Sequence, residues 1–315
     1  MNKYSKMKSS LIDLNDLPIY IAGHIKPDQD SIGSCLALAH WLNSQGKNAK
    51  VLLKKGDETI IDWQGQNELI VFGIAEKDYN FIALDVNEMK RLGEFYEGFL
   101  NAKHTINIDH HQGNLFEANE TLSVAGISST CEIIYEIIKS AKGEKLENNI
   151  CELLYAGMMN DTNCFSRRLS KNTLKIAQKL INQGINYTSI IKKTFSSRSL
   201  YQFKALAKVV NELKFDGIYY AVIDKSLEEF KNLSHNQIVK QIAEDLRQIE
   251  GIDVFFMLIK DGETIVAKVM TNSSDNADKI AMLFGGGGHK KEAGFTIKNI
   301  SIDEIIEKTK NYLNI

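Results

Sequence analysis

Short apolar runs alternate with stretches of helical apolar spacing along the first two thirds of the chain. Continuous apolar runs at 18–23, 80–86 and 105–108 predict buried strands. Between them, apolar residues recur every three or four positions, which predicts helices. The expected helices lie at 31–46, 92–102, 128–140, 148–159, 173–183, 187–195 and 200–213. Alternating strands and helices favour a parallel sheet with both faces covered, so we expect an N-terminal α/β domain.

The pattern changes after Gly217. The run at 218–223 predicts a strand, and those at 254–259 and 265–270 predict a hairpin that turns at Asp261-Gly262. A helix is expected at 235–249, and an amphipathic helix closes the chain. We therefore expect a second, smaller α/β domain with a mixed sheet.

The length of 315 residues agrees with about two domains. We place the first domain at 1–190, a helical linker at 191–215 and the second domain at 216–315.

Composition narrows the class of protein. Apolar residues make up 43% of the chain and charged residues 25%, as in soluble globular proteins. The net charge of −2 argues against binding to long duplex nucleic acid, which needs a broad basic surface. No export signal and no run of about 18 apolar residues is present, and the four cysteines are scattered. We expect a reduced, cytoplasmic protein without a membrane partner.

Histidine and aspartate follow several of the predicted strands. His24 comes after the first, Asp85 ends the second, and Asp109–His111 follow the third. The carboxyl ends of parallel strands lie at one edge of a sheet, where ligand sites occur. Loops add three more carboxylates, those of Asp28, Asp30 and Asp161.

For the first loop alone, an ordinary turn and helix start is an equally good interpretation, with Asp30 or Ser31 as the cap. The whole cluster is different, because so many carboxylates in one cleft repel one another unless cations neutralise them. Aspartate mixed with histidine, without cysteine, favours two Mn²⁺ ions, with Mg²⁺ or another divalent ion as second choice. A closed structural Zn²⁺ site fits poorly.

Five segments together resemble a known family. GHIKPDQDSIGS, IALDV, IDHH and MMNDT are similar to the four motifs of the DHH phosphoesterase superfamily. FGGGGHKKEAGF resembles the signature of its DHH-associated C-terminal domain. In length and domain order the chain resembles the bifunctional nano-RNase (oligoribonuclease)/pAp phosphatase (NrnA-like) group. It departs from the pattern at Gln29, where Gly is usual, and at 163–166, where Asn-Cys-Phe-Ser replaces Gly-Gly-Phe-Arg.

The resemblance implies two metal sites that share one carboxylate. The first would be formed by His24, Asp28 and Asp85, and the second by Asp30, Asp85, His110 and Asp161. It also implies that His111 faces the substrate phosphate and that Asp109 orients a histidine. The catalytic residues would then be Asp85, Asp109 and His111.

A second candidate site is the glycine run, Gly285, Gly286, Gly287 and Gly288, followed by His289. Four glycines free the backbone to present N–H groups to an anion, although a run of this kind is equally often a flexible connector. Beside a phosphate-directed first site, phosphate or nucleotide binding is favoured. Arg198 resembles a family arginine that contacts a substrate phosphate, and a solvated helix-end arginine is the alternative.

The activity implied by the resemblance is two-metal hydrolysis of phosphate esters. The expected substrates are short single-stranded RNA, cut to nucleoside monophosphates, and pAp, cut to AMP. A cyclic-dinucleotide phosphodiesterase acting on c-di-AMP or pApA is the alternative enzyme, and a nucleotide-binding regulatory module is the non-enzymatic one. The sequence has a complete set of candidate metal ligands, which argues against a nucleotide-binding module without catalytic activity. The motifs leave open the preferred substrate, the direction of degradation and the physiological metal, and a homodimer is compatible with them.

Overall fold

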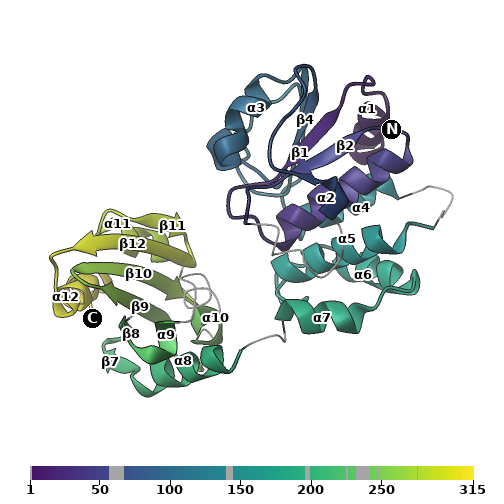
Figure 1. The fold of residues 1–315 in the computed structure, drawn as a ribbon. Coiled ribbons are helices and arrows are strands. Elements are labelled where there is room, and N and C mark those ends of the chain that lie inside the picture. Colours follow the sequence, from purple (N-terminus) through teal and green to yellow (C-terminus); the bar gives the residue numbers. More distant parts are fainter. Residues whose placement is uncertain are drawn as a thin grey trace. The chain divides into compact units, whose positions relative to one another are not determined.

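The structure is a computed structural model that describes residues 2–56, 67–139, 145–195, 199–224, 226–231, 242–246, 248–274 and 276–315. The chain forms two compact units, Met1–Ser197 and Arg198–Ile315 (Figure 1). Each unit has its own sheet and its own hydrophobic core.

Unit 1 is built on a parallel sheet in the order β3-β2-β1-β4-β5-β6. The strands are β1 (Ile19–Ala22), β2 (Ala49–Leu52), β3 (Ile70–Val71), β4 (Asn80–Leu84), β5 (His104–Asp109) and β6 (Glu120–Ser123). All six run in one direction, so their carboxyl ends share one edge. The predicted α/β fold with a parallel N-terminal sheet is confirmed.

Helices cover both faces of this sheet (Figure 1). They are α1 (Lys3–Ile12), α2 (Gln29–Ser44), α3 (Tyr96–Leu100), α4 (Thr130–Ile138), α5 (Asn148–Asp161), α6 (Thr173–Asn182) and α7 (Tyr187–Phe195), with short 3₁₀ segments η2 (Asn67–Leu69) and η3 (Met89–Phe95). Successive side chains of a strand point to opposite faces. Accordingly, Ile19 and Ile21 join the core under α2, α4 and α5, whereas Tyr20 and Ala22 join the smaller core under η3 and α3.

Two glycines let α2 and α5 approach closely. A Cβ atom at Gly33 of α2 would lie 2.8 Å from the carbonyl oxygen of Leu153 in α5. A Cβ atom at Gly157 of α5 would lie 3.0 Å from both Cα and Oδ1 of Asp30 in α2. Larger residues would force these backbones apart, so the two glycines hold Asp30 and the end of α5 at a fixed separation.

Unit 2 has a mixed sheet in the order β11-β12-β10-β9-β8-β7, in which only the β8–β9 pair is parallel among the described strands. The strands are β7 (Lys214–Asp216), β8 (Ile218–Asp224), β9 (Val254–Asp261), β10 (Thr264–Thr271), β11 (Gly287–His289) and β12 (Glu292–Lys298). The helices are α8 (Leu200–Asn211), α9 (Glu228–Lys231), α10 (Ala243–Leu246), α11 (Ala277–Met282) and α12 (Ile302–Leu313). The second α/β domain with a mixed sheet is therefore confirmed.

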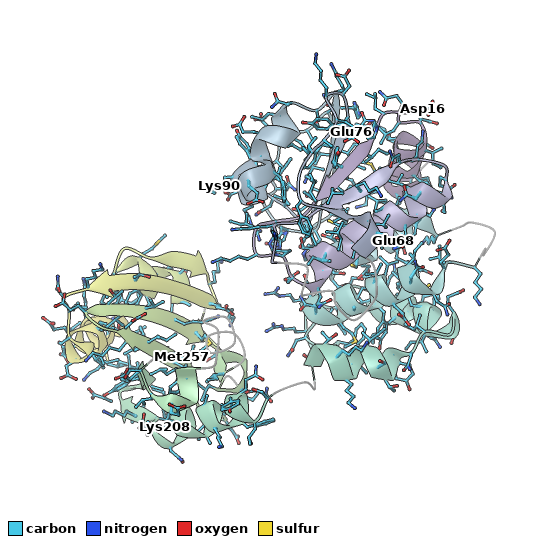
Figure 2. The ribbon with its side chains drawn as sticks, in the orientation of Figure 1. Asp16, Glu68, Glu76, Lys90, Lys208 and Met257 are labelled. Carbon is cyan, nitrogen blue, oxygen red and sulfur yellow. The ribbon has the colours of Figure 1, made fainter. Side chains whose placement is uncertain are left out.

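The side chains of β9 alternate between two cores, with Met257 (labelled in Figure 2) buried in one core and Phe256 in the other. Helix α8 lies within the range proposed as a linker and packs into unit 2, where Ala205 and Val209 are buried. The predicted helix at 235–249 lies largely outside the described residues, and only α10 within it is described.

The glycine run ends in a strand. Gly287, Gly288 and His289 of β11 pair with Gly294, Ala293 and Glu292 of β12. A Cβ atom at Gly286 would lie 2.2 Å from the carbonyl oxygen of Gly294, whereas one at Gly287 would meet nothing within 4 Å. Gly286 is thus required by backbone packing, and Gly287 faces open space.

This difference predicts unequal effects of two matched substitutions. Gly286→Ala drives a methyl group into the β12 backbone and should lower the free energy of unfolding by about 1–3 kcal/mol. Gly287→Ala has room for its methyl group and should change it by less than about 1 kcal/mol. Urea titrations of the two variants measure this; equal destabilisation would show that β11 does not pack on β12 in this way.

Candidate metal centre

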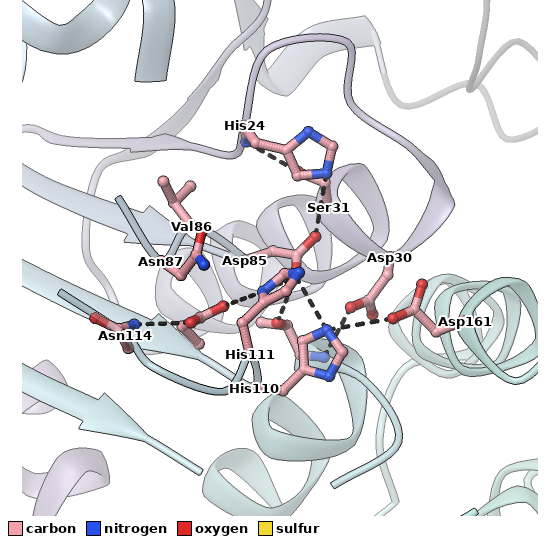
Figure 3. A network of polar contacts seen from close by, with 12 residues as sticks. His24, Asp30, Ser31, Asp85, Val86, Asn87, His110, His111, Asn114 and Asp161 are labelled. Carbon is pink, nitrogen blue, oxygen red and sulfur yellow. Dashed lines mark hydrogen bonds and ion pairs between the residues drawn. The ribbon is translucent and has the colours of Figure 1, made fainter. Parts of the chain in front are cut away.

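Five elements of unit 1 bring their acidic and histidine side chains to one place. The loops after β1, β4 and β5 contribute His24, Asp85 and His110, while α2 and α5 contribute Asp30 and Asp161 (Figure 3). All are at the carboxyl edge of the sheet, as the order of strand and polar residue in the sequence predicts.

Asp85 is at the centre of this cluster. Its two carboxylate oxygens face different histidines, with Oδ2 at 3.4 Å from Nε2 of His24 and Oδ1 at 3.4 Å from Nε2 of His110. The Thr130 hydroxyl donates to Oδ1 at 3.1 Å. Asp85 has a φ of +61°, which side chains other than glycine rarely adopt, so the surrounding loop holds it in a strained conformation.

The N-terminus of α4 fixes Asp30. The backbone N–H groups of Thr130 and Cys131 donate to its two carboxylate oxygens at 2.7 and 2.9 Å, and its side chain is fully buried. Asp28 begins α2, because its Oδ1 accepts from the N–H groups of Asp30 and Ser31 at 3.1 and 3.2 Å. The expectation that Asp30 or Ser31 caps this helix is therefore wrong: the Asp30 carboxylate is already held by α4.

In His24 and in His110, a contact of one ring nitrogen with a carbonyl oxygen leaves the other ring nitrogen facing the cluster. Nδ1 of His24 lies 2.8 Å from the carbonyl oxygen of Ile25, so Nε2 is left towards Asp85. Nδ1 of His110 lies 3.4 Å from the carbonyl oxygen of Ile127, and its Nε2 lies 3.2 Å from Oδ2 of Asp161. Histidines that bind metal ions through Nε2 are commonly oriented in this way.

Asp109 is fully buried and contacts His111, the second histidine of the segment Asp109–His111. Its Oδ1 lies 2.7 Å from Nδ1 of His111, and its Oδ2 accepts from Nδ2 of Asn114 at 2.7 Å. The same Asn114 nitrogen lies 3.0 Å from Oδ1 of Asn107, and Nδ2 of Asn107 donates to the carbonyl oxygen of Val86 at 2.9 Å. This chain of amides connects the loop after β4 to the loop after β5.

The charges in the cluster perturb one another strongly. Burial opposes ionisation of Asp85, but hydrogen bonds from His110 and His24 outweigh it and hold the pKa of Asp85 well below its usual range. Burial, together with the neighbouring carboxylates, raises the pKa of Asp30 and of Asp161. Burial lowers the pKa of His110, but Asp85 and the other carboxylates reverse this and raise it to about 10.

Carboxylates buried this close together need positive charge nearby, which divalent cations would supply. The described residues include three groups of possible metal ligands, and within each group the ligand atoms lie within 4.8 Å of one another. The groups are His24, Asp28 and Asp85; Asp30, His110 and Asp161; and Asp85, His110 and His111. The donors are only carboxylate oxygens and imidazole nitrogens, so the residues fit hard divalent cations such as Mn²⁺ or Mg²⁺.

The other candidates lie elsewhere. The glycine run and His289 belong to unit 2, where Gly286–Gly288 border an open groove of about 530 Å³ that also includes Lys268 and Phe295. Arg198 lies outside the described residues. Three residues that the sequence analysis did not select, Asn107, Asn114 and Thr130, touch the cluster or its supports.

The chain after Asp161 is strained. Asn163, Cys164 and Phe165 all have a positive φ, between 48° and 61°. Here the sequence departs from the family pattern, since the first two positions are the ones where glycine is usual. The backbone thus keeps a left-handed turn that glycine would adopt at lower cost.

Two known domain models match this chain. Residues 18–158 match the model of the DHH family, N-terminal domain, and residues 217–314 match the DHHA1 domain. The chain therefore contains a DHH-family N-terminal domain followed by a DHHA1 domain.

Two curated relatives and one solved structure illustrate the similarity. The bifunctional oligoribonuclease and PAP phosphatase NrnA of Thermus thermophilus is 25% identical over 92% of this chain and 87% of its own length. The cyclic-di-AMP phosphodiesterase GdpP of Bacillus subtilis is 23% identical over 94% of this chain but 47% of its own length. An exopolyphosphatase-related protein from Bacteroides fragilis has the same fold, with a TM-score of 0.84, 21% identity and coverage of 100% and 98%.

The family assignment confirms the expectation of a metal-dependent phosphoesterase. No helix in the described part of the chain is long and apolar enough to cross a membrane.

Replacing the central carboxylate should abolish activity. Asp85→Asn removes a negative charge that belongs to two of the three ligand groups and should lower kcat at least a thousandfold, because charge stabilisation by a metal ion contributes several kcal/mol. Steady-state kinetics with Mn²⁺ measure the loss, and circular dichroism verifies the fold. Asp78→Asn, which breaks a surface pair with Lys103, is the matched control. An Asp85→Asn protein within tenfold of the wild-type kcat would contradict the assignment.

Asn114 should act through Asp109 and His111. Asn114→Ala removes the donor to Asp109 and should lower kcat by about ten- to hundredfold, as is typical for residues that orient the groups around a metal. The control is Asn119→Ala, which removes a comparable side-chain acceptor from Thr105 at the opposite end of β5. If both variants lose stability and activity to the same extent, Asn114 has only a structural role.

Proposed function

We propose that this chain is a manganese-dependent phosphoesterase that releases nucleoside monophosphates from short single-stranded RNA and the 3′-phosphate from pAp. The single observation that supports it most is the Asp85 carboxylate, whose two oxygens face two histidine- and aspartate-containing groups. The similarity to oligoribonuclease and PAP phosphatase NrnA over nearly the whole length of both chains supports the choice of substrates.

In this proposal two divalent cations share Asp85. His24 and Asp28 would hold one cation together with Asp85. Asp30, His110 and Asp161 would hold the other. When bound, the cations would stabilise the negative charge that develops on the phosphoryl oxygens and lower the pKa of water.

The protein itself would orient the substrate phosphate. Nδ1 of His111 is engaged by the buried Asp109, so Nε2 of His111 is available to donate to a phosphate oxygen. Asn114 keeps Asp109 in place for this task. Cations that lower the pKa of water would make a side-chain nucleophile unnecessary, so we favour hydrolysis without a covalent intermediate.

We assign the contacts with the rest of the cleaved nucleotide to unit 2. Backbone N–H groups of the run Gly285–Gly288, with His289, would hold the rest of the nucleotide, and Arg198 would reach a phosphate. Within this proposal, 1–190 form the catalytic domain, 191–215 a linker and 216–315 the substrate-binding domain. The enzyme would act in the cytoplasm, in agreement with its scattered cysteines, and a homodimer is compatible with this function.

One purified preparation, assayed against a substrate panel, tests the proposal. With Mn²⁺, the 5-mer RNA and pAp should be hydrolysed with a higher kcat/KM than c-di-AMP, and excess EDTA should abolish all activity. Mn²⁺ should restore it better than Zn²⁺, because the ligand set is rich in carboxylates and lacks thiolates.

The panel also separates the alternatives. A preference for c-di-AMP over the 5-mer RNA, with pApA as the linear product, would make the chain a cyclic-dinucleotide phosphodiesterase, the activity named for the relative GdpP. Full activity in EDTA would refute the two-metal mechanism. Tight nucleotide binding without turnover in any metal would make the chain a regulatory module.

A further inference from the structure

A cavity of about 530 Å³ lies beside the metal centre, entirely within unit 1. Its walls come from the loop after β1, the end of β2 and the η3 segment, all at the carboxyl edge of the sheet. His24 belongs both to this cavity and to the metal cluster, so the cavity continues the site away from Asp85. Its volume lies in the range of small-molecule and cofactor sites.

The walls of the cavity are fixed to one another. The backbone N–H of Ile25 donates to the carbonyl oxygen of Arg91 at 2.7 Å, which ties the loop after β1 to η3. Gly93 has a φ of +58°, and a Cβ atom there would lie 2.1 Å from Cγ2 of Ile25. Only glycine permits this contact, which places Lys26 on one wall and Phe95 on the other.

The lining combines apolar and cationic groups. Leu53 and Leu92 are buried in the floor, and the Phe95 ring is half-buried. Three lysines, Lys26, Lys54 and Lys55, line the cavity with a single carboxylate, that of Glu94. None of the three lysines has an ion-pair partner among the described residues.

We propose that this cavity binds the second nucleotide of an oligonucleotide substrate, with its base against Phe95 and its phosphate among Lys26, Lys54 and Lys55. The inference rests on the proposed function, in which the scissile phosphate lies at the metal cluster. An aromatic ring with neighbouring ammonium groups suits a base and a phosphate, since bases stack on aromatic rings and lysines attract the backbone. Stacking and charge attraction need no hydrogen bonds to particular bases, so this site accepts RNA of any base sequence.

The proposal has a direct consequence for substrate length. A substrate with one nucleotide, such as pAp, leaves the cavity empty, whereas a dinucleotide or a 5-mer RNA fills it. Contacts made only by the longer substrate should appear in its kcat/KM and be absent from that of a minimal phosphodiester.

The test compares a 5-mer RNA with bis(p-nitrophenyl) phosphate, which reaches only the metal cluster. In the double variant Lys54→Ala/Lys55→Ala, the ratio of kcat/KM for the RNA to that for the aryl ester should fall about tenfold, chiefly through KM. Both lysines are exposed, so the fold should tolerate the change. Lys54→Arg/Lys55→Arg should restore the ratio, and Lys6→Ala, at an exposed lysine of α1, should leave it unchanged.

A second variant tests the base. Phe95→Leu keeps an apolar side chain but removes the ring, and should also lower the ratio several-fold while the effect of salt on KM stays as in the wild type. Equal losses on both substrates in the lysine variant would place these lysines at the metal centre and overturn the proposal. An unchanged ratio in both variants would show that the cavity is no substrate site. Wild-type protein that hydrolyses the aryl ester but neither RNA nor pAp would refute the proposed function itself.

Discussion

A single buried carboxylate organises the catalytic unit. Asp85 is 3% exposed and lies between two histidines that arrive from different strands. Its left-handed backbone is held by its own N–H, which donates to the carbonyl oxygen of Ile108 at 3.0 Å, and by the Asn107 side chain on the next residue, Val86. Strain of this kind costs about 1–3 kcal/mol and persists where the surroundings over-determine the geometry.

The rest of unit 1 keeps the partners of Asp85 at the right distance. Parallel strands bring the loops to one edge, the α4 N-terminus grips both oxygens of Asp30, and Gly157 lets α5 lie against α2. Burial of several carboxylates is costly without compensating charge. The same packing that orders the site therefore creates its requirement for cations, which links the fold of unit 1 to a metal-dependent reaction.

Much of the fold could be predicted because its signals are local. Residues Phe81–Leu84 of β4 are all apolar, since both faces of the strand are buried, and Asp85 follows directly after the strand. Short edge strands carry no comparable signal, so β6, β7 and β11 were not expected. The helix expected at 92–102 is instead a 3₁₀ segment followed by α3, because Gly93 has a non-helical backbone that lets Ile25 pack against it.

The ligand candidates of unit 1 could be selected because histidine or aspartate follows three predicted strands and three loop carboxylates join them, whereas their supports could not. Asn107 lies inside an apolar strand and Asn114 in a loop, and neither belongs to a pattern. Thr130 looks like an ordinary residue at a helix start, and its role depends on contacts with Asp30 and Asp85, which are distant in sequence. Hydrogen bonds between residues so far apart in the sequence depend on the tertiary structure and leave no local pattern in the sequence.

The shared role of Asp85 is tested most directly by diffraction from crystals soaked in Mn²⁺, measured at the manganese absorption edge. Two anomalous peaks are expected on either side of the Asp85 carboxylate, one next to His24 and Asp28, the other next to Asp30, His110 and Asp161. A single peak that does not touch Asp85, or no peak at this edge of the sheet, would contradict the two-metal centre.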